Sequence, residues 1–280
     1  MIAFPNAKIN IGLNVVAKRE DGYHDIETVF YPVLLQDVLE VIPMHRVQIR
    51  KENTTGYELE MTGNEYPFPA QDNLVVKAYL MLAQDFNLPA VDIRLYKHIP
   101  SGAGLGGGSS DCAAMISLLN RRFNLHMRDP MMERYAARLG SDCAFFITNT
   151  PSLATGRGEI LTPISLSLCQ YTILLVKPDV HVSTAQAYAG VTPHRSDIAL
   201  ADAVNRPVNQ WKDCIFNDFE PSVFSAFPIL GDIKRKLYDL GAEYASMTGS
   251  GSTIFGLFRK PFDNPQDLFP GMFVCQREMC

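Results

Sequence analysis

The stretch Pro100-Ser101-Gly102-Ala103-Gly104-Leu105-Gly106-Gly107-Gly108-Ser109-Ser110 decides how the rest of this chain is interpreted. It holds five glycines within nine positions. Each glycine costs a helix or strand interior roughly 0.5–1 kcal/mol relative to alanine. Such a run suits a loop whose backbone N–H groups approach a ligand closely. A strand pattern precedes it and a helical pattern over about residues 111–123 follows, so the positive end of a helix dipole faces the loop. The sequence predicts a phosphate site, with Ser109 and Ser110 placed to meet a phosphate oxygen or its metal.

Three better-known phosphate loops fit this stretch poorly. A Walker A loop requires a lysine before the final hydroxyl residue, and none is present. A dinucleotide fingerprint exists formally in Gly102-x-Gly104-x-x-Gly107, but it should follow a buried, continuously apolar strand. The segment Val91–Ile99 instead alternates apolar with charged residues. A protein kinase would carry a His-Arg-Asp segment further on, and the sequence has none.

Length and composition narrow the class of protein. The chain has 280 residues, a length typical of about two domains. Its 47% hydrophobic and 20% charged content excludes a disordered chain, and a formal charge of −5 argues against a nucleic-acid or membrane-surface binder. No apolar stretch approaches the ~20 residues needed to span a bilayer. Six cysteines without a CxxC pair predict reduced thiols in a cytoplasmic protein. The sequence gives no oligomeric state.

Hydrophobic periodicity predicts an α+β architecture with two domains, residues 1–157 and 158–280. In the first domain, Asp72 is predicted to cap one helix and Asp129 another. Residues 151–163, rich in Gly, Pro and Thr, are predicted to cross between the domains. The second domain has the order β-α-β-β-α-β, which is typical of a split βαβ, ferredoxin-like layer. The expected strands are 9–15, 38–42, 47–50, 57–61, 91–99, 171–176, 243–247, 253–258 and 272–275, and the expected helices are 73–86, 111–123, 129–139, 229–240 and 265–269.

Three motifs in one order resemble the GHMP small-molecule kinases. The glycine run is similar to their central phosphate-binding motif, Pro5–Leu13 to an amino-terminal motif, and Met247–Ser252 to a third glycine loop. Order and spacing fit from residue 3 to about residue 258. The resemblance implies the two-domain GHMP kinase fold, with an N-terminal half like ribosomal protein S5 domain 2 and a C-terminal ferredoxin-like half. It also implies ATP as phosphoryl donor, with Mg²⁺ expected and no protein ligand assigned to it.

Four further segments resemble one branch of this family. They are Asp21–His24, Asp72–Leu74, Gly140–Asp142 and Gly156–Glu159. That branch phosphorylates the 2-hydroxyl of a cytidine-diphosphate-linked polyol, in the non-mevalonate route to isoprenoid precursors. The chain departs from the usual pattern twice: Cys143-Ala144 follows Asp142, and Asp111 stands where asparagine is usual.

The resemblance also implies roles for individual residues. Asp142 is expected to act as general base, and Lys8 to keep it ionised and lower the pKa of the hydroxyl. From the residues alone, Asp142 could be a capping residue and Lys8 a solvated surface lysine. The expected ATP-binding residues are Pro100, Ser101, Gly102, Ala103, Gly104, Leu105, Gly106, Gly107, Gly108, Ser109, Ser110, Asn73 and Lys97. The expected substrate-binding residues are Asn10, Tyr23, His24, Thr184 and Tyr188. The site residues expected from the third glycine motif are Thr248, Gly249, Ser250 and Gly251.

Some alternatives stay open. Tyr188 could stack on cytosine or be a core aromatic residue. The chain could be a GHMP kinase of the homoserine or mevalonate type, against which the Asp21–His24 turn argues. It could also be a catalytically silent nucleotide-binding regulator, against which the presence of both Lys8 and Asp142 argues.

Overall fold

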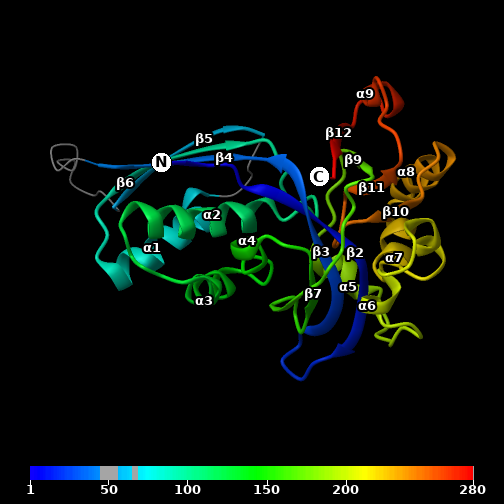
Figure 1. The fold of residues 1–280 in the computed structure, drawn as a ribbon, viewed down its shortest axis with the longest axis horizontal. Helices are drawn as coiled ribbons and strands as arrows, with labels where there is room; N and C mark the ends of the chain where they lie inside the picture. Colours follow the sequence, from blue (N-terminus) through cyan, green and yellow to red (C-terminus); the bar gives the residue numbers. More distant parts are fainter. Residues whose placement is uncertain (45–55, 65–68, 280) are drawn as a thin grey trace. The chain divides into compact units, whose positions relative to one another are not determined.

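The computed structural model describes residues 1–44, 56–64 and 69–279 (Figure 1). Contacts divide the chain into two compact units. Unit 1 comprises Met1–Ala7, Leu35–Ser101 and Gly106–Asn149, and unit 2 comprises Lys8–Leu34, Gly102–Leu105 and Thr150–Cys280. Each unit is assembled from segments far apart in sequence. The predicted domain boundary at 157/158 is a division along the sequence, and it stays a prediction.

The sheet of unit 1 has the strand order β1-β4-β6-β5, in which only the β5–β6 pair is parallel. The alternation seen in the sequence of β6 is realised: Val91, Ile93 and Leu95 are buried, whereas Arg94 and Tyr96 are exposed. This mixed, half-exposed sheet explains why the dinucleotide fingerprint had the wrong context. The strands are β1 (Ile2–Ala3), β4 (Val38–Pro43), β5 (Tyr57–Gly63) and β6 (Val91–Lys97).

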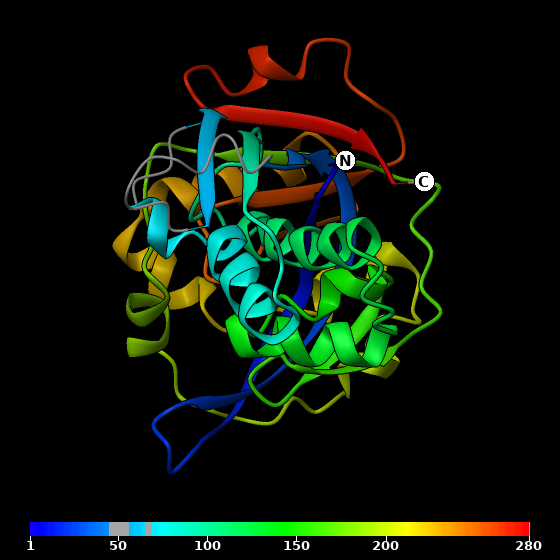
Figure 2. The same cartoon turned by 90° about the vertical axis from the view of Figure 1, so that its left-hand side faces the viewer.

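The helices of unit 1 pack side by side, coloured cyan to green in Figure 2. They are α1 (Leu74–Phe86), α2 (Gly107–Arg122), α3 (Asp129–Leu139) and α4 (Phe145–Thr148), with a 3₁₀ turn η2 (Ala70–Asp72) before α1. In Figure 1, α1 and α2 run along one face of the sheet. Their apolar positions, such as Val76 and Leu82 on α1 and Ile116 on α2, are fully buried.

Two predicted capping residues and one predicted helix start were wrong. Asn73, and not Asp72, caps α1, because its Oδ1 accepts a hydrogen bond from the backbone N–H of Val75 at 2.9 Å. Arg128 is the N-cap of α3, and Asp129 lies inside the first turn. Helix α2 begins at Gly107 rather than near Asp111, since the Ser110 N–H already donates to the Gly106 carbonyl at 2.9 Å.

The first sheet of unit 2 has the order β2-β3-β7-β8. The predicted strand 9–15 is the centre of β2 (Asn6–Lys18), which is buried on both faces up to Val15. Strand β3 (His24–Gln36) was not predicted. Residues 151–163, expected to cross between the domains, form an antiparallel hairpin of β7 (Ser152–Thr155) and β8 (Ile160–Pro163). The turn contains Gly156 in a left-handed conformation. The two strands are too short to give a periodic signal in the sequence.

The second sheet of unit 2 confirms the split βαβ prediction. Its order is β10-β11-β9-β12 and every pair is antiparallel. Numbered within the motif this is 2-3-1-4, the ferredoxin-like arrangement. The strands are β9 (Thr172–Lys177), β10 (Tyr244–Met247), β11 (Ile254–Phe258) and β12 (Phe273–Glu278), and the helices of unit 2 are α5 (Thr184–Ala189), α6 (Leu200–Ala203), α7 (Glu220–Ala226), α8 (Pro228–Asp239) and α9 (Pro265–Leu268), with a 3₁₀ helix η3 (Val208–Asp213).

A core in unit 2 joins this sheet to β2. Leu174 and Val176 on β9 and Leu230 and Ile233 on α8 share one buried cluster with Leu13. The predicted strand 47–50 lies outside the described residues. Among residues 1–44, 56–64 and 69–279, no helix combines the length and the apolar character needed to cross a membrane.

Candidate active site

The three sequence motifs meet inside unit 2. The backbone N–H of Lys8, in the first motif, donates to the Leu105 carbonyl at 2.9 Å. The hydroxyl of Thr248, in the third motif, lies 3.0 Å from the carbonyl oxygen of Gly104. A Cβ placed on Gly104, whose φ is +75°, would lie only 2.1 Å from the carbonyl oxygen of Thr248. Glycine at 104 therefore permits a backbone-to-backbone contact between two glycine loops.

Lys8 is buried within this junction. Its side chain is 3% exposed, so a solvated surface lysine is excluded. Its Nζ donates to Oδ1 of Asn10 at 2.5 Å and lies 5.0 Å from the centre of the Phe30 ring. Asn10 is also buried, and its backbone N–H donates to the hydroxyl of Thr248 at 3.0 Å. The ammonium group is thus held in one place by neighbours that are themselves fixed.

Asn217 supports the third glycine motif, and sequence reasoning missed it. Its Nδ2 donates to the carbonyls of Met247 and Gly249, both at 2.8 Å, and its Oδ1 accepts from the Phe219 N–H at 3.0 Å. Its side chain is buried at 2% exposure. The residue stands in a short stretch without periodicity, so the sequence carried no signal for this role.

In unit 1, the amino terminus of α2 has the features of a phosphate cradle. Gly106, its N-cap, has φ +71°, a conformation that glycine adopts without strain. The first N–H groups of a helix have no partner within it, and its dipole favours negative charge there. Ser109 is half-buried and Ser110 is buried in this first turn. Backbone donors and hydroxyls therefore gather where the sequence predicts phosphate.

A buried ion-pair cluster lies beside this helix start. Nζ of Lys97 donates to Oδ2 of Asp111 at 2.6 Å and also to Asp37. Asp37 in addition accepts the backbone N–H groups of His98 and Ile99, at 2.6 and 2.8 Å. A Cβ on Gly107 would come within 3.3 Å of Nζ of Lys97. The cluster thus fixes the strand end that enters the glycine run.

Burial shapes the protonation of this cluster. It raises the pKa of Asp111 to about 7, although the Lys97 charge works in the opposite direction. Burial acts to lower the pKa of Lys97, but Asp111 and Asp37 outweigh it and raise that pKa. Oδ1 of Asp111 has no hydrogen-bond partner among the described residues. Sequence reasoning did not single out Asp37, because one acidic residue in a strand connection gives no pattern.

Two predicted adenosine contacts, Asn73 and Lys97, have partners within unit 1. Asn73 is buried at 3% exposure, caps α1 and donates through Nδ2 to the Met61 sulfur at 3.4 Å. Lys97 is 2% exposed within its ion-pair cluster. Their contact with adenosine stays a prediction.

Asp142 lies half-buried in the turn between α3 and α4. The next residue, Cys143, is fully buried. A hydrogen bond from Cys112 and a smaller effect of one from Ser109 lower the pKa of its thiol. Cys143 therefore links the turn that carries Asp142 to the first turns of α2. Lys8 belongs to unit 2 and Asp142 to unit 1, and their pairing stays a prediction.

The predicted base-recognition residues include an aromatic pair in unit 2. The rings of His24 and Tyr188 stack with centroids 4.6 Å apart and an angle of 17°. Tyr188 also meets Phe219 edge-on at 4.7 Å, so it borders the core while presenting one face to His24. Tyr23 is 57% exposed, and the guanidinium of Arg157 lies 4.9 Å from its ring centre.

Thr184 is the first residue of α5 and is exposed, and Ser183 caps that helix through a hydrogen bond with Gln186. The arrangement leaves the Thr184 side chain at the surface of unit 2. Its contact with substrate stays a prediction.

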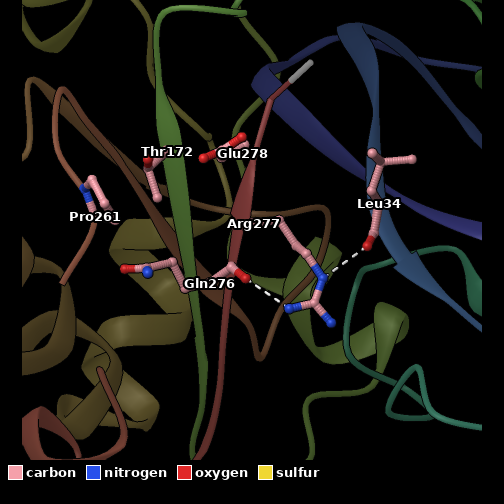
Figure 3. A pocket seen from close by; sticks show the side chains of 6 residues that line it. All are labelled: Leu34, Thr172, Pro261, Gln276, Arg277 and Glu278. Carbon is pink, nitrogen blue, oxygen red and sulfur yellow. Dashed lines mark hydrogen bonds between the residues drawn. The ribbon is translucent and has the colours of Figure 1, made fainter. Parts of the chain in front are cut away.

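A separate cavity of about 320 Å³ lies beside β9 and β12 (Figure 3). The guanidinium of Arg277, at the wall of this cavity, donates to the carbonyls of Leu34 at 2.9 Å and Gln276 at 2.7 Å. The cavity is lined by Leu34, Thr172, Pro261, Gln276, Arg277 and Glu278. None of the predicted site residues is among them, so this cavity is not the candidate active site.

Within residues 1–44, 56–64 and 69–279, no cluster of three His, Cys, Asp or Glu side chains could hold a metal ion. Mg²⁺ in phosphoryl-transfer sites is usually held by substrate phosphates with only one or two protein ligands. A serine hydroxyl at the start of α2 fits such a donor set.

Comparison with known proteins gives consistent matches. Residues 73–150 match the model of the GHMP kinases N terminal domain, and residues 199–268 match the GHMP kinases C terminal domain. The chain is 53% identical to a 4-diphosphocytidyl-2-C-methyl-D-erythritol kinase of Bacteroides fragilis, with 100% of each chain covered. It is 46% identical to the protein of the same name from Parabacteroides distasonis, again with 100% of each covered.

Solved structures agree. A crystal structure of 4-(cytidine 5'-diphospho)-2C-methyl-D-erythritol kinase superimposes with a TM-score of 0.79 at 29% identity, covering 99% of this chain and 98% of that one. The mevalonate kinase of Methanococcus jannaschii matches with a TM-score of 0.69 at 11% identity, covering 100% and 98%, and this likeness shows the fold alone.

Proposed function

The chain belongs to the GHMP kinases and, among them, to the family of 4-diphosphocytidyl-2-C-methyl-D-erythritol kinases, and on this premise we propose that it phosphorylates the 2-hydroxyl of that cytidylyl polyol. It is a small-molecule kinase that uses ATP. The reaction breaks the bond between the γ-phosphorus of ATP and its bridging oxygen and forms a bond from that phosphorus to the substrate oxygen. ADP leaves, and the hydroxyl loses its proton.

Asp142 accepts that proton in the proposed mechanism. A carboxylate is a suitable general base for a hydroxyl whose oxygen is gaining a bond to phosphorus. Support comes from its position: its turn is tied through Cys143 to Ser109 on α2, the helix proposed to hold the phosphates. Because the base and the phosphate cradle lie on neighbouring segments of one unit, the acceptor hydroxyl and the γ-phosphoryl group would be held close together.

Lys8 supplies positive charge in the proposed mechanism. A cation near Asp142 favours the ionised carboxylate and lowers the pKa of a hydroxyl bound between them. The ammonium of Lys8 is buried, donates a hydrogen bond to Asn10 and lies over the Phe30 ring. Low local polarity strengthens its attraction for an anionic transition state.

The ATP phosphates bind, in this proposal, to the glycine run and the N–H groups that open α2. The Ser109 or Ser110 hydroxyl would hold Mg²⁺ together with the phosphates. The ion would neutralise charge on the moving phosphoryl group. We also propose a cytoplasmic location, where ATP is available as the phosphoryl donor.

The cytidine end of the substrate is assigned to His24, Tyr23 and Tyr188. Nucleobases are recognised by flat side chains and by hydrogen bonds to their edges. Because His24 and Tyr188 stack on each other at 4.6 Å, a base cannot lie between them without moving one ring. The base therefore stacks on the outer face of this pair or displaces one member.

The observation that carries the proposal is the junction of Lys8, Asn10, Gly104 and Thr248: three distant motifs meet there, and Asn10 accepts a hydrogen bond from the buried ammonium of Lys8. A silent nucleotide-binding regulator has no use for such a group. Kinases of the homoserine type share the fold at only 17% identity, with a TM-score of 0.64.

The test is a coupled assay of ADP release with the cytidylyl polyol, homoserine and mevalonate as acceptors. We expect turnover with the cytidylyl polyol at least 100-fold above the other two, since a site built for a base rejects acceptors that leave its polar groups unpaired. ³¹P NMR of the product checks that the 2-hydroxyl is the site of transfer. Equal turnover of all three acceptors would contradict the proposed substrate.

A further inference from the structure

The hydrogen-bond chain that ends at Lys8 begins at Thr28, a fully buried residue on β3. The Thr28 hydroxyl lies 2.5 Å from the carbonyl oxygen of Gly12. A carbonyl oxygen can only accept, so the single hydroxyl hydrogen of Thr28 is directed to Gly12. The lone pairs of the same hydroxyl are then left to accept a hydrogen bond.

Asn10 supplies that hydrogen bond. Its Nδ2 donates to the Thr28 hydroxyl at 3.0 Å, and its Oδ1 accepts from Nζ of Lys8 at 2.5 Å. A side-chain amide has one donor end and one acceptor end. Because the donor end is engaged by Thr28, the acceptor end faces the ammonium.

The other neighbours of Asn10 do not fix the amide in this way. The Thr248 hydroxyl lies 3.2 Å from Oδ1 of Asn10 and 3.0 Å from the carbonyl oxygen of Gly104, so its hydrogen has an acceptor in either orientation of the amide. With the amide reversed, the NH₂ group would face the ammonium of Lys8, and two donors would repel each other. Thr28 and Lys8 thus engage opposite ends of the amide, and the Thr28 hydroxyl anchors its donor end in the orientation that Lys8 requires.

We propose that Thr28 is a positioning residue for Lys8: its hydroxyl sets the Asn10 amide, and the amide sets the ammonium in the reacting geometry. This inference rests on the proposed function, in which Lys8 stabilises the transition state. Thr28 itself touches no substrate. Its effect therefore belongs to kcat rather than to the binding of ATP.

The experiment compares Thr28→Val, which keeps the shape and removes the hydroxyl, with Thr28→Ser, which keeps the hydroxyl. A matched control is Thr172→Val, another buried strand threonine, which lies on β9 in the other sheet of unit 2. A hydrogen bond to a charged group corresponds to roughly a 10- to 100-fold change. We expect kcat to fall by about that factor in Thr28→Val, with KM for ATP within two-fold of wild type. Thr28→Ser recovers most of kcat, and Thr172→Val is unaffected.

A second measurement needs no turnover. In the full chain labelled with ¹⁵N-lysine, the Lys8 ammonium is expected to give a signal protected from exchange, and Thr28→Val is expected to shift or broaden it. Thermal melts accompany each variant. An unchanged Lys8 signal in Thr28→Val, or equal kcat losses in the Ser and Val variants, would overturn the proposal. If the wild type does not phosphorylate the cytidylyl polyol but Thr28→Val still shifts the Lys8 signal, the link from Thr28 to Lys8 is supported. The proposed function is then contradicted.

Discussion

Nζ of Lys97 lies 2.6 Å from Oδ2 of Asp111, and Asp37 binds the same ammonium. One positive charge thus faces two carboxyl groups in a buried site. Two ionised carboxylates would leave an uncompensated negative charge there, which is strongly unfavourable in a protein interior. The raised pKa of Asp111, about 7, is the expected response, since protonation leaves a neutral acid beside a Lys97–Asp37 pair.

Asp111→Asn should stabilise the protein more at high pH than at low pH. Asp111 titrates near 7 when folded but near its ordinary value of 3.8 when unfolded. Between these values the folded chain holds a proton that the unfolded chain has lost, so the free energy of unfolding of the wild type falls as pH rises from about 4 to about 7. Asparagine mimics the neutral acid and lacks this dependence.

Urea unfolding at pH 5 and pH 8 measures the effect, with the exposed Asp232→Asn as control. We expect the Asp111→Asn variant to gain stability over wild type at pH 8, with a clearly smaller gain at pH 5. The same difference at both pH values would mean that Asp111 is ionised throughout.

Asp142→Asn should lower kcat by roughly 10²–10⁴, the usual span for loss of a general base. Asparagine keeps the shape of the side chain but cannot take a proton. ATP affinity, measured by calorimetry, is expected to stay within two-fold because the carboxylate acts on the acceptor hydroxyl. Near-normal turnover in a pure preparation would remove Asp142 from the base role.

Gly104→Ala and Gly108→Ala should separate folding from phosphate binding. A Cβ at 104 would lie 2.1 Å from the Thr248 carbonyl oxygen at a φ of +75°, so we expect a loss of at least about 3 kcal/mol in stability. At 108 the nearest heavy atom is 4.0 Å away, and alanine favours helix by up to about 1 kcal/mol.

Thermal melts and ATP calorimetry give the two readouts. Gly108→Ala is expected to fold normally and to bind ATP more weakly, because the methyl group is added in the first turn of α2, beside the N–H groups proposed to bind phosphate. Unaltered ATP affinity in that variant would argue against a cradle at the start of α2.

Tyr188→Ala should weaken the cytidylyl substrate by about 1–3 kcal/mol, the range for base–aromatic stacking, without changing KM for ATP. Removing the ring also removes its contact with Phe219, so a thermal melt is needed beside the kinetics. Tyr188→Phe keeps both ring contacts and is expected to retain KM for both substrates. If Tyr188→Ala raised both KM values equally, the residue would be part of the core and not of the base site.

Most of the fold could be predicted from the sequence. Strand β6 alternates strictly, and the βαββαβ order of the second half leads to the observed 2-3-1-4 sheet. Strand β3 was missed because it is buried at consecutive positions, including Val29, Phe30 and Tyr31, and thus has no clean period of two. The start of α2 was placed late because Gly107 and Gly108 are poor helix formers, yet the helix includes them.

The candidate site was predictable where a motif marks it. Lys8, Asn10, Gly104 and Thr248 come from three separate motifs, and the structure brings them together in unit 2. Their supports were not predictable, because Asp37, Thr28 and Asn217 act through hydrogen bonds to residues far away in the sequence. One hydrogen bond between distant residues leaves no trace in local periodicity.

The double hydrogen bond from Asn217 to Met247 and Gly249 has a consequence for affinity. A loop with Gly249 and Gly251 has more backbone freedom to lose than a loop of the same length without glycine. Because Asn217 holds the loop in the free protein, this conformational entropy is lost when the chain folds and not when a ligand arrives. In the proposed kinase, the third motif is therefore already ordered when a ligand arrives, and a larger share of the contact energy remains as binding free energy.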